Sequence, residues 1–236
     1  MFLCRKHAEQ CRNENIYIVT VDSDIAIYSV YFADKFNSKI YIDIGSGKFR
    51  RILDVKAIFD NIGGSIAQAL PALHAFTGND YTSAFHAMGK IKSYKILKKF
   101  EHFQYAFGRI GEDFEFDMEL FDSVQEFVCA LYGLKSMADV NEARYVKFCS
   151  KKGRIPEPQQ LPPTRDELLQ HCKRVSYVTA IIKQALELNV EYPSPQGHGW
   201  IITASGDLEI EWMTQKPAPD SILEMVSCSC KRSKCH

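Results

Sequence analysis

The segment Ile16-Tyr17-Ile18-Val19-Thr20-Val21-Asp22-Ser23-Asp24 decides the expected fold, because a β-branched run ends there in two carboxylates. The near-continuous apolar pattern over 16–20 predicts a buried strand of the kind found in parallel sheets. Apolar and aromatic residues over 25–36 cover more than one helical face, which is typical of a helix packed against a sheet. Asp24 is placed to cap that helix. A strand followed by a helix predicts an α/β fold with a mainly parallel sheet.

The pattern after residue 36 predicts a hairpin and then a series of helices. Strands are expected at 40–44 and 49–53, with a glycine-containing turn over 45–48. The apolar spacing farther along predicts helices at about 55–61, 65–76, 81–87, 91–107 and 117–133.

The C-terminal third begins with a stretch that is too proline-rich for a helix or a central strand, which predicts a linker. Thr164 and Glu167 then have the spacing of a capping box and open a helix that extends to about Asn189. Two short runs, 199–202 and 208–212, flank a Ser-Gly-Asp turn and predict a second hairpin. The predicted organisation is a domain over 1–154, a linker over 155–164, a helix and hairpin appendage over 165–226 and a cysteine-rich tail over 227–236.

Composition limits the classes of function. The chain has 236 residues, of which 46% are apolar, and its formal net charge is zero, so a nucleic-acid partner would have to be held by a local basic patch. The first five of the eight cysteines lack paired spacing and are expected to be reduced thiols. Arg5 and Lys6 follow only four residues at the N-terminus, which is too early for the apolar core of a signal peptide. No apolar run reaches the length of about 18 residues that a membrane-spanning helix needs. We therefore expect an intracellular protein, nuclear or cytoplasmic, with no membrane partner; the oligomeric state is open.

Three carboxylates are expected at one edge of the sheet. Asp22 and Asp24 follow the first strand, and Asp80 follows the apolar run 70–76. Functional groups of a parallel sheet gather at the carboxyl ends of its strands, and clustered carboxylates there are typical ligands of Mg²⁺ or Mn²⁺ beside a phosphate. The alternative is that these aspartates only form turns and cap helices.

A basic helix follows Gly89. Lys90, Lys92 and Lys95 precede further lysines, and a glycine turn that opens such a helix offers free N–H groups to a phosphate. The pattern predicts a contact with the backbone of DNA or RNA, without base specificity. The alternative is a solvated helix face with no ligand.

The last residues contain Cys228, Cys230 and Cys235 with His236, interleaved with basic residues. Three thiols and an imidazole at this spacing are suited to Zn²⁺. A thiol tail without metal is the alternative.

At this point the chain resembles a known group. Val21-Asp22-Ser23-Asp24-Ile25, then Leu73-His74-Ala75-Phe76-Thr77-Gly78-Asn79-Asp80-Tyr81-Thr82-Ser83-Ala84-Phe85, then Gly89-Lys90 resemble the PIN-like nuclease domain of the flap endonuclease superfamily, in its asteroid-like, transposon-associated animal branch. The resemblance implies a three-layer α/β/α sandwich that hydrolyses phosphodiesters with Mg²⁺ or Mn²⁺. It matches Asp22 and Asp24 to the family's acid pair and Asp80 to its G-C-D aspartate, with Asn79 in place of the cysteine.

The resemblance extends beyond the acidic motifs. Residues 81–97 resemble the helix-two-turn-helix that grips a duplex backbone, and 161–166, 199–200 and 212–214 resemble the segment before a tesmin-like CXC zinc domain. The family also carries a strand with acidic residues upstream of the helix matched here by 1–10, so the resemblance implies an incomplete sheet and further metal ligands outside this chain. It implies a metal-dependent endonuclease when that strand is supplied. The alternatives are a non-catalytic module that binds nucleic acid or protein, and a fragment of a longer gene product.

Overall fold

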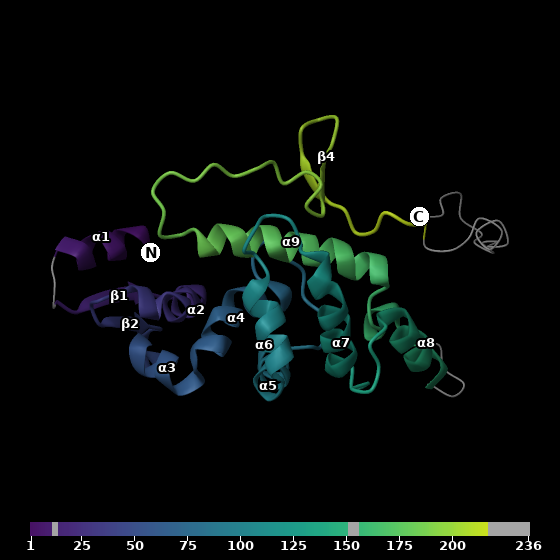
Figure 1. Cartoon of the computed structure of the whole chain (residues 1–236), viewed down its shortest axis with the longest axis horizontal. Helices are drawn as coiled ribbons and strands as arrows, with labels where there is room; N and C mark the ends of the chain where they lie inside the picture. The colour runs from purple at the N-terminus through teal and green to yellow at the C-terminus, as the bar shows by residue number, and fades with distance from the viewer. Residues whose placement is uncertain (11–13, 151–155, 217–236) are drawn as a thin grey trace.

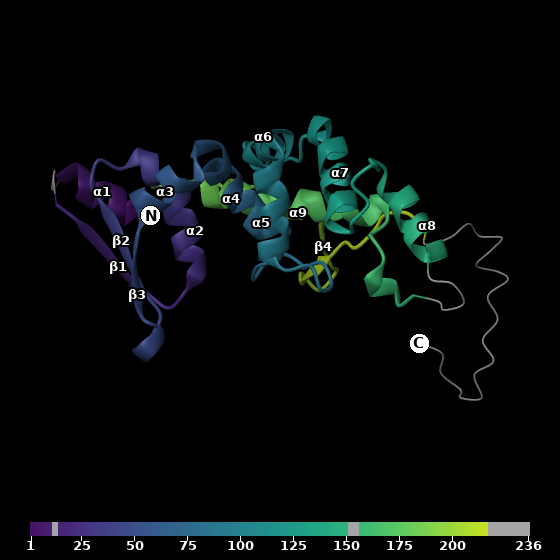
Figure 2. The ribbon, with the colours of Figure 1, turned by 90° about the horizontal axis from the view of Figure 1, so that it is seen from below.

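The computed structural model describes residues 1–10, 14–150 and 156–216. The molecule is elongated, and a small sheet with its helices forms one end of it (Figure 1 and Figure 2). A row of helices continues from this end along one long helix, α9 (Figure 1). The helix α9 spans Arg165–Lys183. The predicted zinc ligands Cys228, Cys230 and Cys235 lie outside the described residues.

The main sheet has three strands in the order β1-β2-β3. Strand β1 (Ile16–Thr20) runs parallel to β2 (Ile40–Ile44), with Ile18 opposite Ile42. Strand β3 (Arg51–Asp54) is antiparallel to β2, so 40–54 forms the predicted hairpin. The strands predicted at 16–20 and 40–44 are therefore confirmed. The sheet, however, is mixed rather than mainly parallel.

Helices cover one face of this sheet. That face presents Ile40 and Ile42, which are buried in one apolar cluster with side chains of α2 (Ser23–Tyr31) and α3 (Val55–Ile62). The opposite face carries Tyr17, Val19 and Ile52, whose exposed fractions are 58%, 78% and 60%. A mixed α/β fold is thus confirmed, but the expected three-layer sandwich is not seen in the described part of the chain, where the sheet and its helices form two layers.

The larger core lies among the helices. It is built around α4 (Gly64–Phe76), which packs against α2, α6 and α9. Phe76 at the end of α4 is fully buried and meets Phe107 edge to face, with ring centroids 5.2 Å apart. Leu168 and Val175 of α9 belong to the same apolar cluster, so the predicted C-terminal appendage begins with a helix that is part of the main core.

The remaining elements complete the element order. The other α-helices are α1 (Phe2–Gln10), α5 (Lys90–Lys99), α6 (Glu101–Arg109), α7 (Phe121–Leu131) and α8 (Val140–Ser150). Short 3₁₀ turns are η1 (Ala33–Lys35), η2 (Gly47–Phe49), η3 (Met118–Leu120) and η4 (Pro158–Gln160). Strands β4 (Trp200–Ile202) and β5 (Leu208–Ile210) form the predicted second hairpin. Among the described helices none is long and apolar enough to cross a membrane.

Two predicted helices differ from the structure. The segment 81–87 is not helical, because the side-chain oxygen of Asn79 accepts hydrogen bonds from the backbone N–H groups of Tyr81 and Thr82 and folds the chain into a turn. Ala87 then adopts a positive φ of 56°, which a helix does not allow. The single helix expected over 91–107 is two helices, divided at Phe100, whose backbone is extended.

Candidate functional site

The acidic turn at the end of β1 is organised by Asp22. Its side chain accepts a hydrogen bond from the backbone N–H of Asp24, at 2.8 Å, and Asp22 is the N-cap of α2. The expectation that Asp24 caps this helix is therefore wrong: Asp24 lies in the first turn. Because capping uses one oxygen of Asp22, the second oxygen stays available for a ligand.

Asp24 faces a buried histidine on α4. Its Oδ2 lies 3.0 Å from Nε2 of His74, a residue that is only 4% exposed. The other ring nitrogen, Nδ1, lies 3.1 Å from the ammonium nitrogen of Lys90. An ammonium group only donates, so Nδ1 accepts and the ring proton is on Nε2, which lies close to Asp24 but is not aligned with it for a hydrogen bond. The three side chains form a continuous polar chain from the acidic turn into the protein.

Lys90 is exposed as a whole, but its ammonium group is turned toward the end of α4. From the first turn of α5 its ammonium group donates to the carbonyl oxygens of His74, at 3.3 Å, and Gly78 at the end of α4. Burial lowers the pKa of Lys90, and the charge of Asp24 opposes this effect. Burial also lowers the pKa of His74, again against Asp24. Lys90 was predicted to bind a nucleic-acid backbone, but its contacts in the structure hold α4, α5 and the acidic turn together.

The third predicted acid, Asp80, lies in the loop after α4 and is exposed. Asn79, and not Asp80, forms the turn at this point, so the alternative that Asp80 caps a helix at Tyr81 is wrong. Within the described ranges the Asp80 carboxylate has no hydrogen bond or ion pair. It is free to bind a ligand.

The phenol of Tyr28 is influenced by the charges of all three predicted acids. Burial raises the pKa of the Tyr28 phenol to about 12, and the charges of Asp24, Asp22 and Asp80 add to the effect. Acids from two separate segments, 22–24 and 80, thus act on one phenol of α2. That these carboxylates lie together at one edge remains a prediction. His74, which lies next to Asp24 and Tyr28, was not identified from the sequence as part of the site, although a histidine within the apolar run 70–76 was a signal.

The donor set fits a hard divalent cation only in part. Carboxylate oxygens suit Mg²⁺ and Mn²⁺. Among the described residues, however, no three His, Cys, Asp or Glu side chains are grouped so that they would hold a metal ion by themselves. Mg²⁺ commonly keeps several waters and is bound by one or two carboxylates together with substrate phosphates, which this arrangement allows.

The basic helix α5 presents a second surface. Its N-cap is Gly89, which has no side chain to cap the free N–H groups of the first turn. The buried residues of α5 are Ser93 and Leu97. Lys92 and Lys95 are exposed, and the Lys92 ammonium lies 3.2 Å from the sulfur of Met88. No acidic partner of Lys95 occurs in the described part of the chain. This lysine face is therefore available to a polyanion.

Comparisons with protein-family models, with curated proteins and with solved structures find no match to this chain. The resemblance to PIN-like nucleases therefore rests on the motifs quoted above, and the function is argued from the geometry of the site.

Proposed function

We propose that the acidic edge formed by Asp22, Asp24 and Asp80 binds Mg²⁺ or Mn²⁺ and a phosphodiester of DNA or RNA, as the metal site of a nuclease-type domain. The observation that carries this proposal is that the charges of all three carboxylates, from two separate segments, act on the phenol of Tyr28. A bound divalent ion would neutralise phosphate charge and lower the pKa of a water molecule for attack on phosphorus. The motif resemblance supports the same chemistry.

The protein's own residues have separate roles in this proposal. Asp80 has no partner in the part of the chain that the structure describes, so its charge is available to the ion. Oδ2 of Asp24 lies 3.0 Å from Nε2 of His74, whose tautomer Lys90 fixes, and the other oxygen of Asp24 would be the one to contact the ion. Lys92 and Lys95 face solvent on α5 and would contact the phosphate backbone.

The experiment is a thermal melt of the whole chain with increasing Mg²⁺ or Mn²⁺, followed by cleavage of labelled single-stranded and duplex DNA and RNA in Mn²⁺. Binding to the folded state alone raises the melting temperature by mass action. We expect this rise in the wild type, its loss in Asp80→Asn, and its persistence in Asp60→Asn, a matched control because exposed Asp60 pairs, among the described residues, only with Lys56 of its own helix. A melting temperature insensitive to metal in the wild type, or an unchanged response in Asp80→Asn, would overturn the metal site.

A second candidate function is a non-catalytic module that binds nucleic acid, and the exposed lysine face of α5 favours it. In that case the double variant Lys92→Gln/Lys95→Gln weakens binding to single-stranded or duplex nucleic acid and flattens its dependence on salt, because fewer counterions are released. Asp80→Asn then leaves the affinity unchanged or higher. Cleavage in Mn²⁺ that disappears in Asp80→Asn would exclude this reading.

A further inference from the structure

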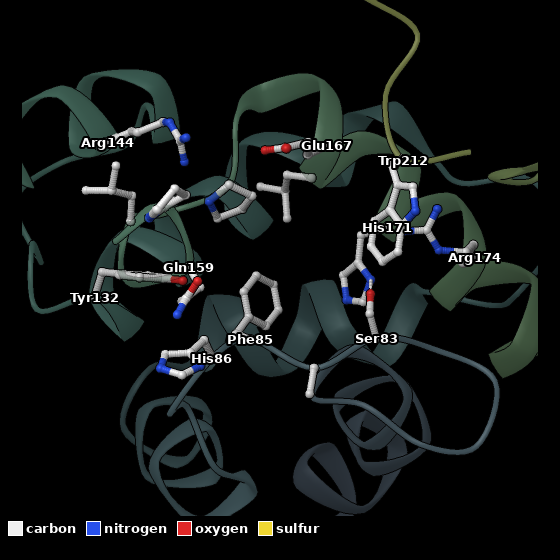
Figure 3. Close-up of a pocket in the computed structure, with 15 residues that line it drawn as sticks. Ser83, Phe85, His86, Tyr132, Arg144, Gln159, Glu167, His171, Arg174 and Trp212 are labelled. Carbon is white, nitrogen blue, oxygen red and sulfur yellow. Dashed lines mark hydrogen bonds between the residues drawn. The ribbon is translucent and has the colours of Figure 1, made fainter. Parts of the chain in front are cut away.

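A cavity of about 480 Å³ lies between the loop after α4, the first half of α9 and the chain around Trp212 (Figure 3). None of its lining residues belongs to the acidic site described above. Its size is within the range of pockets that bind small molecules.

The cavity is lined by a buried guanidinium group that lacks a counter-charge. Arg174 is 1% exposed, and its Nη1 donates to the carbonyl oxygens of Gly199 and Glu211, each at 2.9 Å. Its Nε is buried and has no hydrogen-bond partner among the residues that the structure describes. No carboxylate of the described residues forms an ion pair with Arg174. A buried charge that meets only neutral carbonyls is costly, and an unsatisfied buried donor calls for an explanation.

A second guanidinium group reaches the same space. Arg144 of α8 donates to the carbonyl oxygen of Pro162 and likewise forms no ion pair with a described residue. Figure 3 shows Arg144 on one side of the cavity and Arg174 on the other. The one carboxylate in the lining, Glu167, accepts the backbone N–H of Thr164 at 2.7 Å as part of the capping box. Two positive charges and one negative charge therefore line the cavity.

The remaining polar groups support binding rather than covalent chemistry. Ser83 lies 3.4 Å from Nδ1 of His171, a pair that resembles a nucleophile and its base. His171 Nε2 lies 2.9 Å from the carbonyl oxygen of Phe76 and so carries the proton. Burial lowers the pKa of His171 to about 4, which makes it a poor base for removing the proton of a serine.

Aromatic surfaces form the rest of the wall. The lining includes Phe85, Tyr132 and Trp212, and the Trp212 ring lies 5.7 Å from the guanidinium carbon of Arg174. Trp212 is 58% exposed, so one side of the cavity opens to solvent beside a ring. Flat aromatic faces next to a guanidinium group suit a ligand that combines a ring with an anion.

We propose that this cavity is a binding site for a small organic anion, a ring-bearing phosphate or carboxylate whose charge is balanced by Arg144 and Arg174 on opposite sides of the cavity and whose ring packs on Phe85 and Trp212. The proposal does not depend on the nuclease-type function.

The test is a titration of the whole chain, by calorimetry and by tryptophan fluorescence, with four probes: phenyl phosphate, benzoate, inorganic phosphate and phenol. We expect saturable binding of phenyl phosphate or benzoate, about tenfold or more tighter than that of phenol, because charge-assisted hydrogen bonds contribute to the anion alone. Phenyl phosphate and benzoate distinguish phosphate from carboxylate. Inorganic phosphate is expected to bind more weakly than phenyl phosphate, because it lacks the ring.

Arg144→Gln is the main variant, because Arg174 supports two carbonyl groups and its replacement endangers folding. We expect Arg144→Gln to weaken binding of the anion about tenfold and Trp212→Ala to abolish the fluorescence response, while Arg51→Gln, an exposed arginine on β3, leaves both unchanged. Phenol binding as tight as phenyl phosphate, affinity for the anion unchanged in Arg144→Gln, or no saturable binding of either anionic ring probe would overturn the proposal.

Discussion

The buried ring of His171 is expected to make the stability of the protein depend on pH. It is 6% exposed, and burial lowers its pKa from 6.5 to about 4 in the folded chain. Below about pH 6.5 the unfolded chain therefore binds more protons at this residue than the folded chain does. The contribution of His171 to stability is complete above that pH and is lost progressively as the pH falls from about 6.5 to about 4.

The size of the effect follows from the two pKa values. Each unit of difference corresponds to about 1.4 kcal/mol, so the full loss below about pH 4 is about 3 kcal/mol. At about pH 5, where the folded state is still mostly neutral at His171, the loss is about 2 kcal/mol relative to about pH 8. For a chain of this length that corresponds to a melting temperature lower by about 4 to 8 °C.

The assay is urea unfolding of wild type, His171→Gln and His86→Gln at about pH 5 and about pH 8, monitored by circular dichroism. Glutamine keeps a donor for the carbonyl of Phe76 and an acceptor for Ser83 without a titrating ring. We expect His171→Gln to lose about 2 kcal/mol less than wild type between the two pH values, whatever its stability at about pH 8. His86 is exposed and should leave the difference unchanged. An identical pH dependence in His171→Gln and wild type would refute the reasoning.

Three further substitutions test the local structure by urea unfolding. Asp22→Ala removes the N-cap of α2 and should cost about 1 kcal/mol, whereas Asp22→Asn should cost less; equal costs would argue against a capping role. Lys90→Met should cost about 1 to 3 kcal/mol of stability, because it leaves Nδ1 of His74 unpaired. It should also raise the pKa of His74, measured by NMR, because it removes a nearby positive charge. Gly199→Ala should cost at least about 1 kcal/mol, because φ is +85° and a Cβ would lie 2.7 Å from Cγ of Arg174; wild-type stability would contradict this.

Features set by local spacing could be predicted from the sequence. The run 16–20 is β1 to the residue, and the capping box of Thr164 and Glu167 has both of its hydrogen bonds. The second hairpin around 205–207 also formed as expected. In each case the deciding contacts join residues that are close in sequence, so the pattern of residues alone contains the information.

Features set by tertiary contacts could not be predicted. The turn over 81–87 depends on one amide side chain that outweighs a helical pattern, and Lys90 turns inward because the end of α4 offers it carbonyl oxygens. The cavity next to His171 is built from segments between residues 83 and 212, whose approach no local pattern reveals. The uncovered face of the main sheet was likewise unexpected, because strand periodicity does not say how many helices pack against a sheet.

The charge balance of the acidic edge connects the inward turn of Lys90 to the proposed function. Asp22, Asp24 and Asp80 bring three negative charges, Lys90 brings one positive charge, and His74, with its proton on Nε2, is neutral. Three minus one leaves two uncompensated negative charges, which one divalent cation would balance. Had Lys90 pointed to solvent to hold a phosphate backbone, three carboxylates would repel one another without an internal counter-charge. The contact that removes Lys90 from the predicted nucleic-acid surface would therefore also give the acidic edge the charge that the proposed Mg²⁺ or Mn²⁺ site requires.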